Sequence, residues 1–369
     1  MCLLLLALAA CGPVPHDDGL PKGALLAGDA DALRRIALRL ERLAETPLGR
    51  EARVVRDRLE GCKQFVASTP NGDAVALFAS IRCDSVETLP KAARALLGAK
   101  SLVIVWPFAG DGRLAGAIDV SASGSVDLAA TLRLAAATGL ASLVMPAEAP
   151  SGAAVLADGD TLLHARFRPE AGIKIASLVP AGSQADAMFR LKSELFAGTV
   201  LDGTWEAAIY LPDAGHGMPP IALAVGTRAQ APAVAAMEKF IADLGSTWAV
   251  TRHTASIAGH EGACLSDLRI LPEFAPCYVA TDRALVVGWN AASVAKGFEA
   301  GSAPLPESAA ALVVRLDRFP EADERLRQVL APGAPKAALD YAWQRAELRA
   351  ERVGDATRIR VELRAGGES

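Results

Sequence analysis

The stretch CYVATDRALVVGW, residues 277–289, shows how this chain is built. Two apolar runs, 277–281 and 284–289, flank Asp282-Arg283, the two residues of a tight turn. Such runs on either side of a two-residue turn are typical of an antiparallel hairpin. Asn290 follows and can cap a short helix that carries Val294 and Phe298. Paired strands followed by a helix predict an α+β fold.

Similar elements extend outward from this hairpin. Upstream, apolar residues at helical spacing predict a helix that ends at Gly245, and strands are expected over 247–257 and 263–271. An order of strand, helix, strand, strand recurs three times, as a repeat of element order and not of residue identity. The predicted units are 74–80, 89–97, 101–107 and 113–121; 161–167, 183–196, 204–211 and 221–227; 309–316, 321–330, 341–352 and 356–364. We therefore expect mixed, mostly antiparallel sheets packed by helices.

Helical spacing also predicts two helices near the N-terminus, over 29–43 and 48–59, separated by Thr46-Pro47. The apolar stretch 128–145 predicts a helix that Asp127 caps and Gly139 ends. Its length and its polar residues argue against a membrane span.

The N-terminal residues MCLLLLALAAC, 1–11, form an apolar run that is too short to span a membrane and suits a signal peptide. The tetrapeptide Leu8-Ala9-Ala10-Cys11 resembles the lipobox of bacterial lipoproteins. The resemblance implies that residues 1–10 are removed and that Cys11 is diacylated. One feature departs from the family, because no Lys or Arg precedes the apolar run. The alternative is a buried N-terminal strand or helix that ends in cysteine.

The expected organisation follows from this anchor. Residues 11–28 are rich in Pro, Gly and Asp, a composition that predicts a lipidated tether. We expect an N-terminal helical and α+β domain over 29–150 and C-terminal α+β structure over 151–369. Gly12 lacks the acidic character that retains some lipoproteins in the inner membrane. The resemblance thus implies an outer-membrane lipoprotein that faces the periplasm or the cell surface.

Four cysteines remain besides Cys2 and Cys11, and an even number in an exported chain favours disulfides. Proximity in the sequence suggests the pairs Cys62–Cys83 and Cys264–Cys277, although four cysteines allow three connectivities. A zinc site is disfavoured, because neither pair has CxxC spacing.

The hairpin from Tyr278 to Gly288 is similar to a "YxATDxxLVVG" motif in a poorly characterised family of bacterial exported proteins. In that family the motif precedes an Asn- or Ser-capped helix, as Asn290 does here. The resemblance covers about fifteen residues, bears on the fold only and implies no known chemistry.

Catalytic patterns are sparse. The sequence contains no GxSxG, Walker-type loop or HExxH. Ser293 and Lys296 form an SxxK of the kind that serine acyl-enzymes use, but the accompanying SDN and KTG motifs are absent and chance explains the match. The remaining candidate constellation is a possible zinc or thiol site, for which an ordinary hairpin loop is the favoured interpretation. Its residues are His253, His260, Glu261 and Cys264.

The net charge of −4 and the absence of a basic stripe give little support to nucleic-acid binding, so no nucleic-acid partner is expected. The expected function is a lipid-anchored envelope protein with a non-catalytic binding or scaffold role, and envelope proteins as partners. A carrier of a hydrophobic ligand is the alternative, and an enzyme with an unrecognised site is least favoured. No catalytic residue, metal or cofactor is assigned.

Overall fold

The chain forms two compact units, residues 1–145 with 337–369 and residues 146–336. The computed structural model describes residues 19–43, 46–108, 112–133, 155–156, 159–168, 201–213, 218–245, 250–266, 275–298, 310–330, 342–354 and 356–366. The expected domain boundary at residue 150 lies close to the observed division. The C-terminal hairpin, however, belongs to the first unit and not to the C-terminal domain, because its last strand pairs with residues 126–132.

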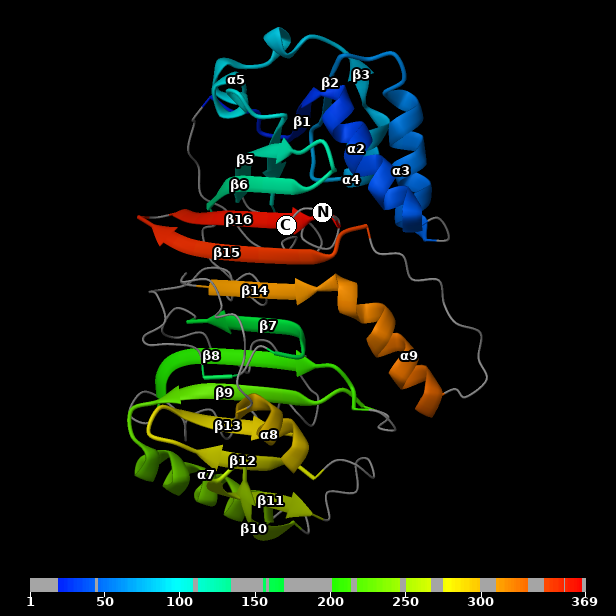
Figure 1. The fold of residues 1–369 in the computed structure, drawn as a ribbon. Coiled ribbons are helices and arrows are strands. Elements are labelled where there is room, and N and C mark those ends of the chain that lie inside the picture. The colour runs from blue at the N-terminus through cyan, green and yellow to red at the C-terminus, as the bar shows by residue number, and fades with distance from the viewer. Residues whose placement is uncertain are drawn as a thin grey trace. The chain divides into compact units, whose positions relative to one another are not determined.

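The first unit, which we call unit 1, contains an antiparallel sheet (Figure 1). Its described strands lie in the order β15-β16-β6-β5-β4-β1-β2-β3. Their bounds are β1 Ala24–Asp29, β2 Gln64–Thr69, β3 Arg82–Cys83, β4 Leu102–Pro107, β5 Arg113–Val120, β6 Val126–Arg133, β15 Arg345–Val353 and β16 Ala356–Arg364. Strands β4 and β5 match the strands predicted over 101–107 and 113–121 and pair with each other as a hairpin.

Strand β1 shortens the expected tether. The Pro-, Gly- and Asp-rich composition predicts that the tether extends to residue 28, but residues 24–28 lie between β2 and β4 and are buried. A strand that is buried on both faces shows no alternation of polar and apolar residues, so period-2 analysis misses it. Any tether must therefore end before Ala24.

The two N-terminal helices are confirmed as α2, Ala30–Leu40, and α3, Pro47–Arg58. The Asp29 carboxylate accepts the Asp31 N–H and caps α2, while the Thr46 hydroxyl accepts the Gly49 N–H and caps α3. Helix α5, Lys91–Leu97, confirms another prediction and packs through Ala93 and Leu97 on the sheet.

Two predicted elements of unit 1 are wrong in type. Residues 74–79, expected as a strand, form helix α4, because the Asp73 carboxylate accepts the N–H groups of Val75 and Ala76 as an N-cap. The helix expected from residue 128 is instead strand β6 as far as Arg133, and residues 134–150 lie outside the described residues. The first predicted β-α-β-β unit therefore lacks its opening strand.

In the second unit, unit 2, the described strands are also antiparallel to their neighbours and lie in the order β10-β11-β12-β13-β9-β8-β7-β14 (Figure 1). Their bounds are β7 Thr161–Phe167, β8 Leu201–Tyr210, β9 Ile221–Thr227, β10 Thr251–Ile257, β11 His260–Ser266, β12 Cys277–Ala280, β13 Ala284–Gly288 and β14 Ala310–Arg315. Strands β12 and β13 form the expected hairpin around Asp282-Arg283. The helix predicted over 183–196 lies outside the described residues.

Helices cover both faces of the unit 2 sheet. Val279 of β12 packs in the same cluster as Val294 of helix α8, Ala291–Phe298. Its neighbour Tyr278 packs with Met237 of helix α7, Gln230–Gly245. Successive strand residues point to opposite faces, so α7 and α8 lie on opposite sides. The Asn290 side chain accepts the Ser293 N–H, which confirms the predicted cap. Helix α9, Phe319–Leu330, follows β14.

The described residues thus show an α+β fold with antiparallel sheets. None of the helices in this described part of the chain has the length and apolar character needed to cross a membrane.

Candidate functional site

The two disulfides join the predicted cysteine pairs. Cys62 bonds to Cys83 in unit 1, and Cys264 bonds to Cys277 in unit 2. Cys264 and Cys277 stand directly opposite each other on β11 and β12, with Cα atoms 4.0 Å apart. Cys11, the expected lipidation site, lies outside the described residues.

Removing the unit 2 disulfide should destabilise the protein. The double change Cys264→Ala and Cys277→Ala opens a loop with a sequence separation of 13 residues. Constraint of the unfolded chain by such a loop is worth about 3 kcal/mol. Urea unfolding of the oxidised protein should show this loss, and reductant should bring the wild type toward the variant. An unchanged unfolding midpoint in the variant would contradict the prediction.

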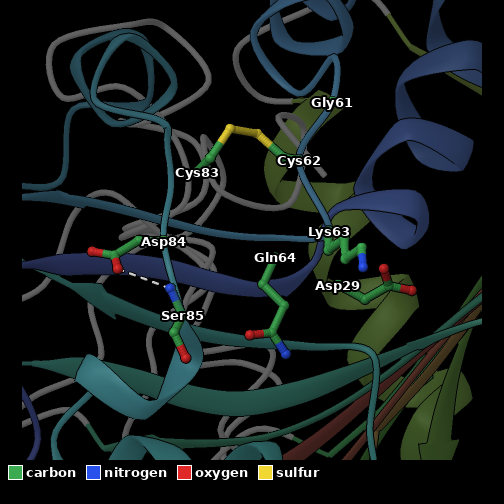
Figure 2. A pocket seen from close by; sticks show the side chains of 8 residues that line it. All are labelled: Asp29, Gly61, Cys62, Lys63, Gln64, Cys83, Asp84 and Ser85. Carbon is green, nitrogen blue, oxygen red and sulfur yellow. Dashed lines mark hydrogen bonds between the residues drawn. A yellow bond between two sulfur atoms is a disulfide. The ribbon is translucent and has the colours of Figure 1, made fainter.

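A cavity of about 570 Å³ lies beside the unit 1 disulfide (Figure 2). Its lining residues are Asp29, Gly61, Cys62, Lys63, Gln64, Cys83, Asp84 and Ser85. Several of these side chains serve the local backbone. Asp29 caps α2, Asp84 accepts the Ser85 N–H at 2.8 Å, and Gln64 accepts the Val86 N–H at 3.3 Å. This cavity is therefore built largely from caps and turns.

The predicted histidine constellation does not assemble. His253 faces Cys264 across β10 and β11, and His260 faces Ile257, four residues further along β10. At ~3.3 Å per residue the two histidines are separated by roughly 13 Å along the strands. His253 Nε2 lies 2.9 Å from the Ser266 hydroxyl, and the His260 ring packs on Phe298. Among the described residues no group of three His, Cys, Asp or Glu side chains is placed to hold a metal.

The SxxK pair does not form a nucleophile either. Ser293 is completely buried, and its hydroxyl donates to the Asn290 side chain at 2.8 Å. The Lys296 ammonium lies 3.5 Å from Asp213 and 3.8 Å from Asp160. Ser293 therefore serves the helix cap, and Lys296 belongs to an ion-pair cluster.

Arginine and glutamate alternate on one face of the β15–β16 hairpin. Glu347 lies 2.6 Å from Arg345 and 2.9 Å from Arg349. Burial raises the pKa of Glu347, but the hydrogen bond from Arg349 and the two guanidinium charges together hold that pKa below its ordinary value. These charges therefore compensate one another, and Glu347 is buried between its two arginine partners.

A second cavity, which we call the unit 2 cavity, has a volume of about 270 Å³. Its walls come from β7, β8, β9 and the β12–β13 turn. The lining residues are Val155, Arg166, Asp202, Thr204, Glu206, Ala224, Gly226, Thr227, Asp282 and Arg283. Most are charged or carry a hydroxyl, so this is a polar cavity supported by a sheet.

A β-bulge shapes the unit 2 cavity. The register between β8 and β9 shifts between Leu201 and Trp205, where Gly203 has a φ of +90° that favours glycine. The Asp202 carboxylate accepts the Thr204 N–H at 2.7 Å. It also lies over Gly226, because a Cβ there would stand 2.2 Å from Asp202 Oδ1. The bulge and the glycine together hold this carboxylate at the cavity.

A buried ion pair forms another wall. Arg166 on β7 faces Glu206 on β8, and Arg166 Nε lies 3.1 Å from Glu206 Oε1. The Glu206 side chain is 3% exposed and also accepts the N–H groups of Val155 and Leu156, each at 2.8 Å. Both carboxylate oxygens are thereby engaged, so Glu206 is a fixed structural anion.

Two threonines that line the unit 2 cavity have a hydroxyl group with no hydrogen-bond partner in the described part of the chain. Thr204 is 7% exposed and Thr227 is 6% exposed, and neither Oγ1 atom is paired. Buried polar groups in folded proteins are nearly always hydrogen-bonded. Each of these Oγ1 atoms has almost no accessible surface, so both are enclosed by the protein itself.

Of the residues that line the unit 2 cavity, the sequence pattern distinguishes Asp282 and Arg283, as turn residues, and does not mark the others as a site. One signal was present, since Gly226 lies inside the strand predicted over 221–227, and a glycine there often marks a bulge or a close approach of other atoms. The arrangement lacks a nucleophile paired with a base among its described residues. It offers hydrogen bonds and fixed charges, which suit binding.

Comparisons with known proteins leave the family open. No protein-family model matches the chain, and no curated protein matches it. Among solved structures, "Structure of crystal form III of TP0453" is similar over 60% of this chain and 82% of that chain, with 10% identity and a TM-score of 0.34. A similarity this low supports no conclusion about fold or function.

Proposed function

We propose that this chain is an exported, lipid-anchored envelope protein that binds a polar ligand or partner without catalysis. The observation that carries the proposal is the pair of disulfides, one in each unit. Disulfides persist in oxidising compartments outside the cytosol. They therefore support export, which the apolar N-terminus and the sequence Leu8-Ala9-Ala10-Cys11 indicate independently.

The anchor places the proposed role at a membrane surface. Several acyl chains on one residue hold a protein to a bilayer far more firmly than one chain does. We propose diacylation of Cys11 and residence at the outer membrane, with the body on the periplasmic side or at the cell surface. Envelope components would then be the partners within reach.

The character of the unit 2 cavity favours a polar ligand over a hydrophobic one. Cavities for drug-sized ligands usually measure about 300–1,000 Å³ and are mostly apolar. The unit 2 cavity is smaller, and its lining includes Arg166, Asp202, Glu206 and Arg283. An acyl chain placed there would leave these groups without water, which is costly. The hydrophobic-carrier alternative gains no support from this cavity.

The variant Cys11→Ala should abolish membrane attachment. Wild-type protein is expected in the outer-membrane fraction, with an intact mass that is larger than the processed polypeptide by a diacylglyceryl group. The variant should lose both the mass increment and the attachment, because alanine has no thiol to acylate. The matched control is Cys2→Ala, which changes a residue of the removed peptide. If the wild-type protein has no diacylglyceryl mass increment and is not found in the membrane fraction, the proposal is wrong.

A further inference from the structure

We propose that the Cys62–Cys83 disulfide is a site of thiol exchange, which a protein dithiol opens while the Cys264–Cys277 disulfide stays intact. This inference goes beyond the proposed binding role. The observation that carries it is the contrast between the two disulfides, because one lies beside an open cavity and the other lies between two inner strands.

An attacking thiolate can reach the Cys62–Cys83 bond from the Cys83 side. Cys83 is exposed, whereas Cys62 is only 3% exposed. Both residues line the cavity of about 570 Å³, and in Figure 2 the side chains of Lys63, Gln64 and Ser85 point away from the two sulfur atoms. Thiol exchange requires access of the thiolate to a sulfur atom, so we expect the attack at Cys83 Sγ.

The unit 2 disulfide is shielded by its place among the strands. It joins β11 to β12, and each of these strands pairs with a further strand on its other side, β11 with β10 and β12 with β13. Cys277 is 2% exposed and packs in the same cluster as Val294 of α8, with the partly buried Cys264 against it. A thiolate can therefore reach this bond only when unit 2 opens locally.

The exchange consists of two successive displacements at sulfur. A thiolate of the dithiol first attacks Cys83 Sγ, so that a mixed disulfide forms and the Cys62 thiolate leaves. The second thiolate of the dithiol then attacks its own partner sulfur in the mixed disulfide and releases the Cys83 thiolate. Two electrons pass from the dithiol to the protein disulfide, and the two protons of the dithiol end on Cys62 and Cys83.

Reduction should free a weakly packed segment of unit 1. The disulfide closes a loop with a sequence separation of 21 residues, which contains β2, α4 and β3. Strand β3 has two residues at the edge of the described strands, where Cys83 faces Phe65 of β2. Helix α4 buries Leu77 alone among its residues. Because so short a pairing is marginal without a covalent link, we expect β3 to detach and the edge of β2 to open.

The test reduces full-length, oxidised protein in detergent and follows each disulfide separately. The reductant is dithiothreitol or reduced thioredoxin, samples are quenched with N-ethylmaleimide, and peptide mass spectrometry assigns the alkylated cysteines. We expect Cys62 and Cys83 to be alkylated at least ~10-fold faster than Cys264 and Cys277, because only the first bond is accessible in the folded protein. Equal rates, or earlier opening of Cys264–Cys277, would overturn the inference.

Low concentrations of urea distinguish attack on the native protein from attack on an opened form. Below the unfolding transition the rate for Cys62–Cys83 should not change. The slow rate for Cys264–Cys277 should rise, since urea favours openings that expose more surface. If the rate for Cys62–Cys83 rises with urea as steeply as the rate for Cys264–Cys277, the first bond is not attacked in the folded protein and the inference is wrong.

A thioredoxin variant that lacks its second cysteine traps the mixed disulfide and identifies the attacked sulfur. We expect the trapped thioredoxin on Cys83, and a mixed disulfide on Cys62 alone would contradict the assignment. The double change Cys264→Ala and Cys277→Ala is the matched control, because it removes the other disulfide and should leave the rate for Cys62–Cys83 unchanged.

Hydrogen exchange tests the effect on the fold by comparing oxidised wild type with the double variant Cys62→Ser and Cys83→Ser. Amides of residues 64–69 and 74–83 should exchange faster in the variant, and those of β12 and β13 should not change. Equal protection over residues 64–83 would contradict the expected opening. These readouts do not depend on acylation of Cys11, so their failure is distinguishable from a failure of the lipid-anchored role.

Discussion

Glu206→Ala is expected to lower the free energy of unfolding by about 3–5 kcal/mol. The change removes the carboxylate that pairs with the Arg166 guanidinium, whose side chain is only 14% exposed. It also leaves the N–H groups of Val155 and Leu156 without their acceptor. An uncompensated buried charge and two lost backbone hydrogen bonds act in the same direction. Urea unfolding at neutral pH measures the difference.

Two further variants identify the cause of that loss. Glu206→Gln keeps an acceptor oxygen for the backbone and should lie between wild type and Glu206→Ala. The double change Arg166→Met and Glu206→Leu removes both charges and should recover much of the stability, since buried pairs are often replaceable by apolar residues. The control is Glu351→Ala, which breaks an exposed pair with Arg358 and should cost less than about 1 kcal/mol. A Glu206→Ala cost as small as this control would contradict the assigned role.

Caps, turns and closely spaced cysteines, each recognisable from a few neighbouring residues, were predicted correctly from the sequence. Helix α8 begins where Asn290 provides a cap, and the β12–β13 hairpin turns at Asp282-Arg283, as expected from a handful of neighbouring residues. The disulfide partners also followed from short separations in an exported chain. Each of these features is contained within about twenty residues, so the sequence alone was sufficient.

The two elements of the wrong type, 74–79 and 126–133, are both runs of small apolar residues, and such runs can form either a helix or a strand. The apolar run 74–80 fits a buried strand or a helix equally well, and the Asp73 cap decided for the helix. In β6 the buried Val126, Leu128, Ala130 and Leu132 alternate with less buried residues, a period of two that the run of small apolar residues obscured.

The unit 2 cavity was beyond sequence reasoning for a different reason. Arg166 and Glu206 are 40 positions apart, and their pairing depends on the register between β7 and β8. The position of Asp202 over Gly226 depends on a bulge that shifts the β8–β9 register. A shift by one residue would turn every side chain of a strand to the other face. Only tertiary pairing fixes which side chains meet.

Phe65→Ala is expected to destabilise unit 1 by about 3–5 kcal/mol. Phe65 is 0% exposed on β2, where it faces Gly28 of β1 and Cys83 of β3. Truncation removes most of a large apolar side chain and leaves a cavity that close-packed neighbours fill only in part.

Amide hydrogen exchange shows which strands lose stability in the Phe65→Ala variant. Amides of β1, β2 and β4 should exchange faster in Phe65→Ala, because their slowest exchange requires opening of the sheet that this side chain stabilises. Val75→Ala on α4 is the matched control in the same unit, since Val75 is 63% exposed and its truncation should change stability by less than about 0.5 kcal/mol. Unchanged protection in these three strands would show that Phe65 does not anchor the core of unit 1. Faster exchange there would tie β1, the strand that replaces part of the expected tether, to the folded body of the protein.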